Sequence, residues 1–147
     1  TKEKVLWPYN YGTLILGTAR LVDGTGDSTW ENQTERIVLG SQILYNGTVL
    51  YERACATYNQ CNDDQRVFKG IYSRFMGVAK SLVPDFKDHM QELLDGSAVK
   101  AARSCGGGSD GMTYGRNWSY DVDGEYWDGK YSLQGQVSAL EAVLAVI

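Results

Sequence analysis

The segment from Phe68 to Leu82 constrains the fold most, because its apolar residues repeat with the period of an α-helix and without a gap. They recur at the i, i+3, i+4 and i+7 spacing, at Phe68, Ile71, Tyr72, Phe75, Met76, Ala79 and Leu82. This spacing gathers the apolar side chains into a stripe on one helix face, and such a stripe packs against another element. The sequence therefore predicts an amphipathic helix whose apolar face is buried.

Four more segments show helical spacing, with breakers between them. They run from Trp7 to the glycines at 24 and 26, from a Ser28–Glu31 capping box to Asn46, from Pro84 past Ala101, and from Gln134 to Ile147. The first has apolar residues at Leu14, Ile15, Ala19 and Val22, and the last at Val137, Leu140, Val143, Leu144 and Ile147. No convincing strand alternation is present, so we expect an all-α fold of helical hairpins. Periodicity leaves a bundle, a solenoid and an α/α toroid open.

Residues 104–133 interrupt this pattern with closely spaced glycines, and no helix is expected there. A long irregular loop inside a compact domain usually has a function. The loop holds two tryptophans, Trp118 and Trp127, which are candidate stacking platforms for a sugar or packing residues that hold the loop on the helices. It also resembles a calcium loop that starts at Ser119, but Lys130 stands where a bidentate Glu is needed, so we expect no metal.

Charge and cysteine content narrow the function classes. The net charge of −4 disfavours nucleic acid as a partner, and no apolar run is long enough to span a membrane. Cys55 and Cys61 are close enough for a local disulfide, which suits an oxidising compartment. One histidine leaves too few ligands for zinc, so no cofactor is expected. Three Asn-x-Ser/Thr sequons, at Asn32, Asn46 and Asn117, suggest a secreted glycoprotein.

The sequence Asn62-Asp-Asp-Gln65 directly precedes the strongest helix. Two neighbouring carboxylates, Asp63 and Asp64, suit a glycosidase, in which one carboxyl attacks or stabilises the anomeric carbon and the other protonates the leaving oxygen. The alternative is structural, because Asn62 with Gln65 forms a capping box and acidic residues favour a helix start. Lys69 lies one turn from Gln65 and is either a binding residue or an ordinary surface lysine.

Five motifs in this order resemble fungal members of glycoside hydrolase family 76, the endo-α-1,6-mannanases. They are Trp7 to Gly12, Tyr51 to Cys55, Cys61 to Arg74, Cys105 to Gly108, and Gly135 to Glu141. The resemblance covers nearly the whole chain, and the motif from Cys61 to Arg74 is the most specific. It implies that residues 1–147 are the C-terminal portion of a single hydrolase domain, an incomplete (α/α)6 toroid of helical hairpins.

The resemblance further implies a secreted, extracellular or cell-wall enzyme that hydrolyses α-1,6-mannan with retention. Two alternatives remain: a cell-wall transglycosylase acting on mannan or glycolipid-anchor glycans, and a non-catalytic sugar-binding helical module. The family's catalytic Asp pair belongs to its N-terminal half, the expected partner of this chain, so Asp63 and Asp64 are only a fallback pair. We expect Asp64, Gln65, Lys69 and Trp118 to line the glycan groove. Tyr114 stands where the family has a cysteine, which leaves Cys105 without a partner.

Overall fold

A computed structural model describes residues 5–56 and 60–147. Five helices dominate it: α1 (Pro8–Thr25), α2 (Ser28–Ser41), α3 (Phe68–Ala79), α4 (Lys87–Arg103) and α5 (Leu133–Leu144). Short 3₁₀ turns, η1 (Gln42–Leu44), η3 (Gln65–Val67) and η4 (Pro84–Phe86), precede or follow them. All five predicted helices are therefore present, joined by the loops that the glycines and prolines indicated.

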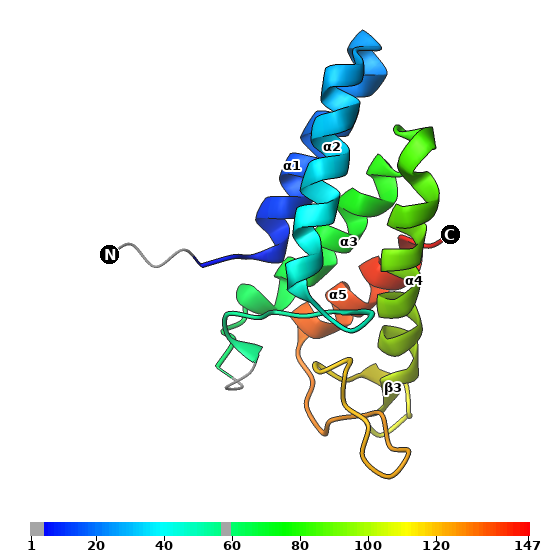
Figure 1. The fold of residues 1–147 in the computed structure, drawn as a ribbon. Coiled ribbons are helices and arrows are strands. Elements are labelled where there is room, and N and C mark those ends of the chain that lie inside the picture. The colour runs from blue at the N-terminus through cyan, green and yellow to red at the C-terminus, as the bar shows by residue number, and fades with distance from the viewer. Residues whose placement is uncertain (1–4, 57–59) are drawn as a thin grey trace.

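The helices form packed pairs around α3 (Figure 1). Helix α1 packs on α2 and α3, while α5 packs on α3 and α4. The two long connections, from η1 to α3 and from α4 to α5, lie at the same end of this array, at the bottom of Figure 1. This arrangement brings together two irregular segments that are far apart in the sequence.

Glycines allow α3 to approach its neighbours closely. A Cβ atom on Gly12 of α1 would lie 2.8 Å from the Cα of Tyr72, and one on Gly70 would lie 2.7 Å from the Cα of Ser138 in α5. Both separations are shorter than a side chain tolerates, so backbone meets backbone at these two crossings. A larger residue at either position would therefore require a whole helix to shift.

Tyr72 is the largest fully buried side chain of the core and hydrogen-bonds within it. Its hydroxyl lies 2.7 Å from the Ser41 hydroxyl and accepts a hydrogen bond from the Tyr45 hydroxyl at 3.4 Å. Burial raises the pKa of Tyr72 to about 12, so the phenol stays neutral. Ser41 also donates to the carbonyl of Val38 at 2.7 Å.

Two helix ends differ from the sequence expectation. The N-cap of α2 is Asp27, whose carboxylate accepts from the Thr29 amide at 2.8 Å, so the predicted Ser28–Glu31 capping box is wrong. Helix α2 also stops at Ser41 and tightens into η1, earlier than the predicted end at Asn46. Ser41 bonds to the preceding turn and to Tyr72 there, which competes with a regular helix.

Two short hairpins were not expected from the sequence. Strands β1 (Tyr45–Asn46) and β2 (Val49–Leu50) pair antiparallel around Gly47, which has a φ of 61°. Strands β3 (Cys105–Gly107) and β4 (Thr113–Tyr114) pair in the glycine-rich loop with an irregular register. Each strand has only two or three residues, too few to show an alternating pattern.

Some of the apolar residues that repeat with helical spacing are not buried. In α1, Ile15 and Ala19 are fully buried but Leu14 is 56% exposed. In α5 the small residues Ala139 and Ala142 are buried, whereas Val137, Leu140 and Leu144 are exposed, as is Ile147 after the helix. Close backbone contact with α3 leaves room only for small side chains on the inner face of α5. The larger apolar residues therefore face outward.

Candidate functional site

One pocket of about 250 Å³ lies between the two long connections. Residues of the segments 50–56 and 61–69 form the first wall of this pocket, and residues of the segment 116–135 form its second wall. Its lining combines four cationic side chains with two carboxylates and one buried tryptophan, namely Arg66, Lys69, Arg116, Lys130, Glu52, Asp128 and Trp118. A pocket that mixes charged groups with an aromatic ring is typical of a site for a polar, ring-shaped ligand.

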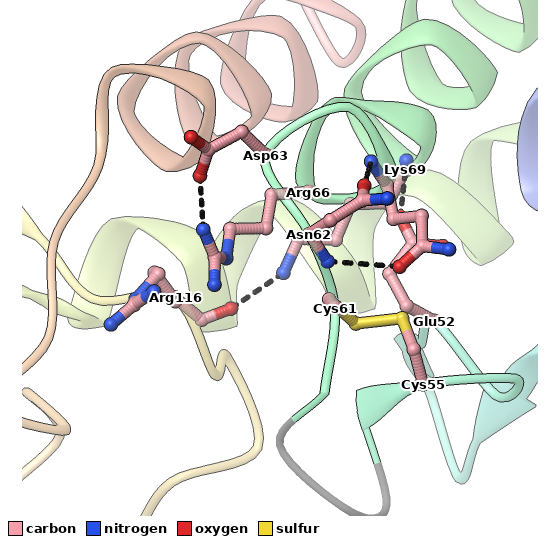
Figure 2. Close-up of a disulfide and its surroundings, with 9 residues drawn as sticks. Glu52, Cys55, Cys61, Asn62, Asp63, Arg66, Lys69 and Arg116 are labelled. Carbon is pink, nitrogen blue, oxygen red and sulfur yellow. Dashed lines mark hydrogen bonds and ion pairs between the residues drawn. A yellow bond between two sulfur atoms is a disulfide. The ribbon is translucent and has the colours of Figure 1, made fainter.

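Lys69 joins the two walls (Figure 2). It lies in the first turn of α3 and is 6% exposed. Its Nζ donates to the Arg116 carbonyl at 2.7 Å and sits 3.9 Å from the centre of the Trp118 ring, a cation–π contact. Burial lowers the pKa of Lys69 to about 8, and the charges of Glu52 and Asp128 limit that shift. Lys69 and Trp118, both predicted to line the glycan groove, are thus in contact.

Glu52 lines the pocket and was not singled out in the sequence analysis. It is 4% exposed, and its Oε1 accepts from the backbone amide of Lys69 at 2.7 Å. Burial raises its pKa to about 7, against the attraction of Lys69 and that hydrogen bond. Its Oε2 is buried without a partner among the described residues. The only sequence signal was the Tyr51–Cys55 motif, in which Glu52 carries no visible role.

The predicted disulfide between Cys55 and Cys61 is present, and Cys61 lines the pocket. Figure 2 shows the bond beside Glu52, at the start of the segment that leads into α3. The crosslink therefore ties the chain after Glu52 to the chain before Lys69. Cys105 is a free cysteine.

Asp128 holds the second wall together. Its Oδ1 accepts from the amides of Arg116 and Lys130, both at 3.2 Å, and its Oδ2 accepts from the Asn117 amide at 3.0 Å. One carboxylate thus draws two stretches of the glycine-rich loop to the same point. The sequence analysis gave no reason to single out Asp128.

The two loop tryptophans both help to fix the loop. Trp118 is 2% exposed, so its ring is a packing residue that also forms part of the pocket lining. Trp127 lies where Gly107 has no side chain, because a Cβ there would be 2.0 Å from the indole. The indole N–H of each ring has no partner among the described residues.

Asp63, Asp64 and Gln65 lie outside the pocket lining. Asp63 pairs with Arg66 and its side chain is 67% exposed. Gln65 completes the predicted capping box, since its side-chain oxygen accepts from the Asn62 amide and its own amide donates to Asn62 Oδ1, both at 2.9 Å. Asp64 is exposed. The capping hydrogen bonds join Asn62 and Gln65. The roles of Asp63, Asp64 and Gln65 as catalytic or groove residues stay predictions.

The calcium-like loop has a different shape from a metal site. Asp123, with a φ of 55°, and Gly124, with a φ of 83°, form a tight turn between Val122 and Glu125. Throughout residues 5–56 and 60–147, no three His, Cys, Asp or Glu side chains gather as metal ligands. The helices of the same residues include none long and apolar enough to cross a membrane.

All three predicted sequon asparagines are exposed. Asn46 lies in the β1–β2 hairpin, Asn32 lies within α2, and Asn117 lies at the pocket. Asn117 Oδ1 accepts from the Ser119 amide at 3.1 Å. Exposure leaves room for a glycan at each position, and glycosylation itself stays a prediction.

The model of one protein family, described as glycosyl hydrolase family 76, matches residues 1–147. Among curated proteins, mannan endo-1,6-alpha-mannosidase DFG5 of Candida albicans is 43% identical over 142 residues, which are 96% of this chain and 31% of that protein. Mannan endo-1,6-alpha-mannosidase DCW1 of Saccharomyces cerevisiae is 42% identical over 138 residues, 94% of this chain and 30% of that protein. This chain therefore spans about a third of the length of these relatives.

A crystal structure of Dfg5 from Chaetomium thermophilum in complex with glucosamine is similar in fold. The TM-score is 0.86 at 27% sequence identity, and the match covers 97% of this chain and 36% of that chain. The predicted fold class, helical hairpins that form part of a larger α/α array, is thereby confirmed.

Proposed function

This chain belongs to glycosyl hydrolase family 76, and from that membership we propose that the protein containing it is an endo-acting hydrolase of α-1,6-mannosidic linkages in mannan. The observation that carries the proposal is the 43% identity over 96% of the chain to a mannan endo-1,6-alpha-mannosidase. Because the chain spans 31% of that relative, the activity belongs to the whole protein, and this portion contributes one part of its groove.

The pocket supports a glycan-binding role for this portion. A sugar ring offers hydroxyls to charged groups and C–H faces to aromatic rings, and the pocket supplies both kinds of partner. Lys69 and Trp118 are held rigidly, which limits the entropy lost when a ligand binds. Of the predicted groove residues, these two line the pocket, while Asp64 and Gln65 would contact a glycan only at the α3 start outside it.

The catalytic carboxylates are proposed to come from the rest of the domain, the N-terminal half. Retention needs two carboxyl groups roughly 5 Å apart on either side of the glycosidic bond. Asp63 is paired with Arg66 at the surface, and Oε1 of Glu52 accepts from the Lys69 amide, so each of these carboxylates already makes a structural contact.

The test uses the full-length protein and α-1,6-linked mannooligosaccharides, with products followed by chromatography and their anomeric form by NMR. We expect internal cleavage with retention that neither Asp63→Asn nor Asp64→Asn abolishes. The isolated 147-residue chain is expected to be inactive. Turnover by that chain, abolished by either Asp variant, would return catalysis to Asp63 and Asp64. Glycan binding by the full-length protein without cleavage would favour a non-catalytic sugar-binding module.

A second candidate is a cell-wall transglycosylase that acts on mannan or on glycolipid-anchor glycans. It is favoured by the glucosamine in the related Chaetomium thermophilum structure, since an amino sugar is not a component of mannan. Adding an acceptor glycan to the same assay separates the two, because a transglycosylase passes most of its glycosyl-enzyme to the acceptor and gives products longer than the substrate, whereas a hydrolase passes most of it to water.

The proposed location is extracellular or in the cell wall. Its support is the Cys55–Cys61 disulfide, which persists in oxidising compartments, together with the exposed sequons. Mass spectrometry of the protein purified from the culture medium and the wall fraction tests both the location and the glycans.

A further inference from the structure

The charge of the pocket differs in sign from that of the chain. Its lining carries four cationic side chains and two carboxylates, whereas the whole chain has a net charge of −4. A local excess of positive charge in an acidic protein attracts anions to that place. The charges of this pocket therefore indicate more than a neutral sugar as the ligand.

Two of the four cations are already engaged. Lys69 faces the charges of Glu52 and Asp128 and donates to the Arg116 carbonyl. Arg66 pairs with Asp63 at the rim. Both remain positive groups in the pocket, but each has its counter-charge close by.

The other two cations, Arg116 and Lys130, form no ion pair with any carboxylate in residues 5–56 and 60–147. The Nε of Arg116 is also buried without a hydrogen-bond partner in that part of the chain. An unpartnered buried donor on a charged group costs free energy unless a ligand satisfies it. Arg116 therefore retains a binding capacity that the fold itself does not use.

Asp128 brings the backbones of these two residues together. Its carboxylate accepts from the backbone amides of Arg116 and Lys130, both at 3.2 Å, and both residues line the pocket. The stem of Arg116 also lies against Gly135, another lining residue, whose Cβ would be 3.3 Å from the Arg116 Cγ. Two cations of one pocket that form no ion pair among the described residues, one of them a guanidinium fork, match the charge and oxygen geometry of a phosphate group.

We propose that Arg116 and Lys130, with Arg66 at the rim, form a subsite for a phosphate ester carried by the glycan. The inference rests on the proposed glycan-binding role of the pocket and names the anionic group that it recognises. A carboxylate has less charge and would leave one cation unmatched, so a sugar phosphate is the better fit than a uronic acid.

The test measures dissociation constants by calorimetry on the full-length protein at low ionic strength, with mannose, mannose 6-phosphate, inorganic phosphate and glucuronate as probes. We expect mannose 6-phosphate to bind at least about tenfold tighter than mannose, and this preference to shrink as salt is added. Arg116→Gln and Lys130→Gln should each remove most of the preference, because each weakens the binding of mannose 6-phosphate more than the binding of mannose. Arg116→Lys, which keeps the charge, should retain part of it.

Arg20→Gln is the matched control, because Arg20 is exposed on α1 outside the pocket and loses the same charge. Equal loss of preference in Arg20→Gln would overturn the subsite, as would equal affinity for mannose and mannose 6-phosphate. Glucuronate or inorganic phosphate binding as tightly as mannose 6-phosphate would overturn the assignment to a glycan-borne phosphate.

The same samples are assayed for cleavage of unphosphorylated α-1,6-mannooligosaccharides. A preference for mannose 6-phosphate without cleavage supports the subsite and contradicts the hydrolase proposal. Cleavage without that preference supports the hydrolase proposal and contradicts the subsite. The unfolding midpoint of each variant, compared with the unaltered protein, confirms that a loss of binding is not a loss of fold.

Discussion

Helix α3 repeats hydrogen bonds within its own backbone after its first turn, where the Lys69 amide donates to Glu52, whereas part of the backbone between α4 and α5 is held by side chains. At Tyr114 of that segment, Gln136 of α5 accepts from the backbone amide at 2.9 Å and donates to the carbonyl at 2.8 Å. Asp128 accepts from three further amides. A helix repeats one local bond many times, so no single side chain decides it, while this loop depends on a few polar side chains.

The helices and the loop between α4 and α5 contribute differently to stability and to the pocket. The helical array supplies rigid backbone contact, and the loop supplies half of the pocket. Substitutions in α3 should therefore weaken the whole domain, and substitutions at the loop's polar side chains should loosen only the pocket. The following expectations, made for the full-length protein, test that division.

The largest effect is expected from Gly70→Val in α3. A Cβ at this position would lie 2.7 Å from the Ser138 backbone, so α3 and α5 have to separate. We expect the free energy of unfolding to fall by about 3 kcal/mol, measured by urea denaturation. Gly17→Ala in α1 is the control, since nothing lies within 4 Å of its Cβ position, and it should raise stability by up to about 1 kcal/mol. Equal effects from both would contradict backbone contact as the cause.

The next effect concerns Glu52, where the two regions meet, and it depends on pH. Burial raises the Glu52 pKa from 4.5 to about 7 in the folded protein, so the folded state holds a proton that the unfolded state has lost. Stability from this group is full below pH 4.5 and falls as pH rises to about 7, by on the order of 2–3 kcal/mol.

Glu52→Gln removes this titration and keeps an oxygen for the Lys69 amide. The variant should therefore gain stability relative to the unaltered protein as pH rises through that window. Urea denaturation at pH 4.5 and 7.5 measures the difference between the two proteins. A stability difference that is the same at both pH values would show that folding does not raise the pKa of Glu52.

A local effect is expected from Asp128→Ala, which deletes the acceptor of three backbone amides. We expect a loss of about 2 kcal/mol in local opening free energy, because a lost charged acceptor leaves those donors unsatisfied. Hydrogen exchange should speed up at Arg116, Asn117 and Lys130 but not in α3. Faster exchange throughout α3 would mean that the loop and the helices unfold as one unit.

The smallest effect is expected from Arg74→Gln on the surface of α3. Arg74 pairs with Glu141 at 2.8 Å, but its side chain is 63% exposed, so water and salt screen the attraction. We expect a loss of about 0.5 kcal/mol that disappears at high salt, measured by thermal unfolding. A loss as large as that of Gly70→Val would show that the pair organises the α3–α5 contact.

Much of the fold was predictable, and less of the site. The five helices followed from apolar period, but the buried face of α5 did not, because Ala139 and Ala142 are inside and Leu140 and Leu144 outside. The spacing of apolar residues along the sequence shows that a helix has an apolar face. The distance between packed helices decides which apolar side chains can be buried between them. Lys69 and Trp118, two of the predicted groove residues, both line the pocket, whereas the sequence analysis singled out neither Glu52 nor Asp128.

The sequence by itself determined the features that residues close along the chain make together. The helices, the Asn62–Gln65 capping box and the Cys55–Cys61 disulfide all join residues a few positions apart. Only the tertiary structure decided the pocket, because Lys69 meets Arg116 across 47 residues and Glu52 meets Lys69 across 17. Such contacts depend on how the helices pack, and the packing brings the two irregular connections to one end of the array, where their buried charges find partners.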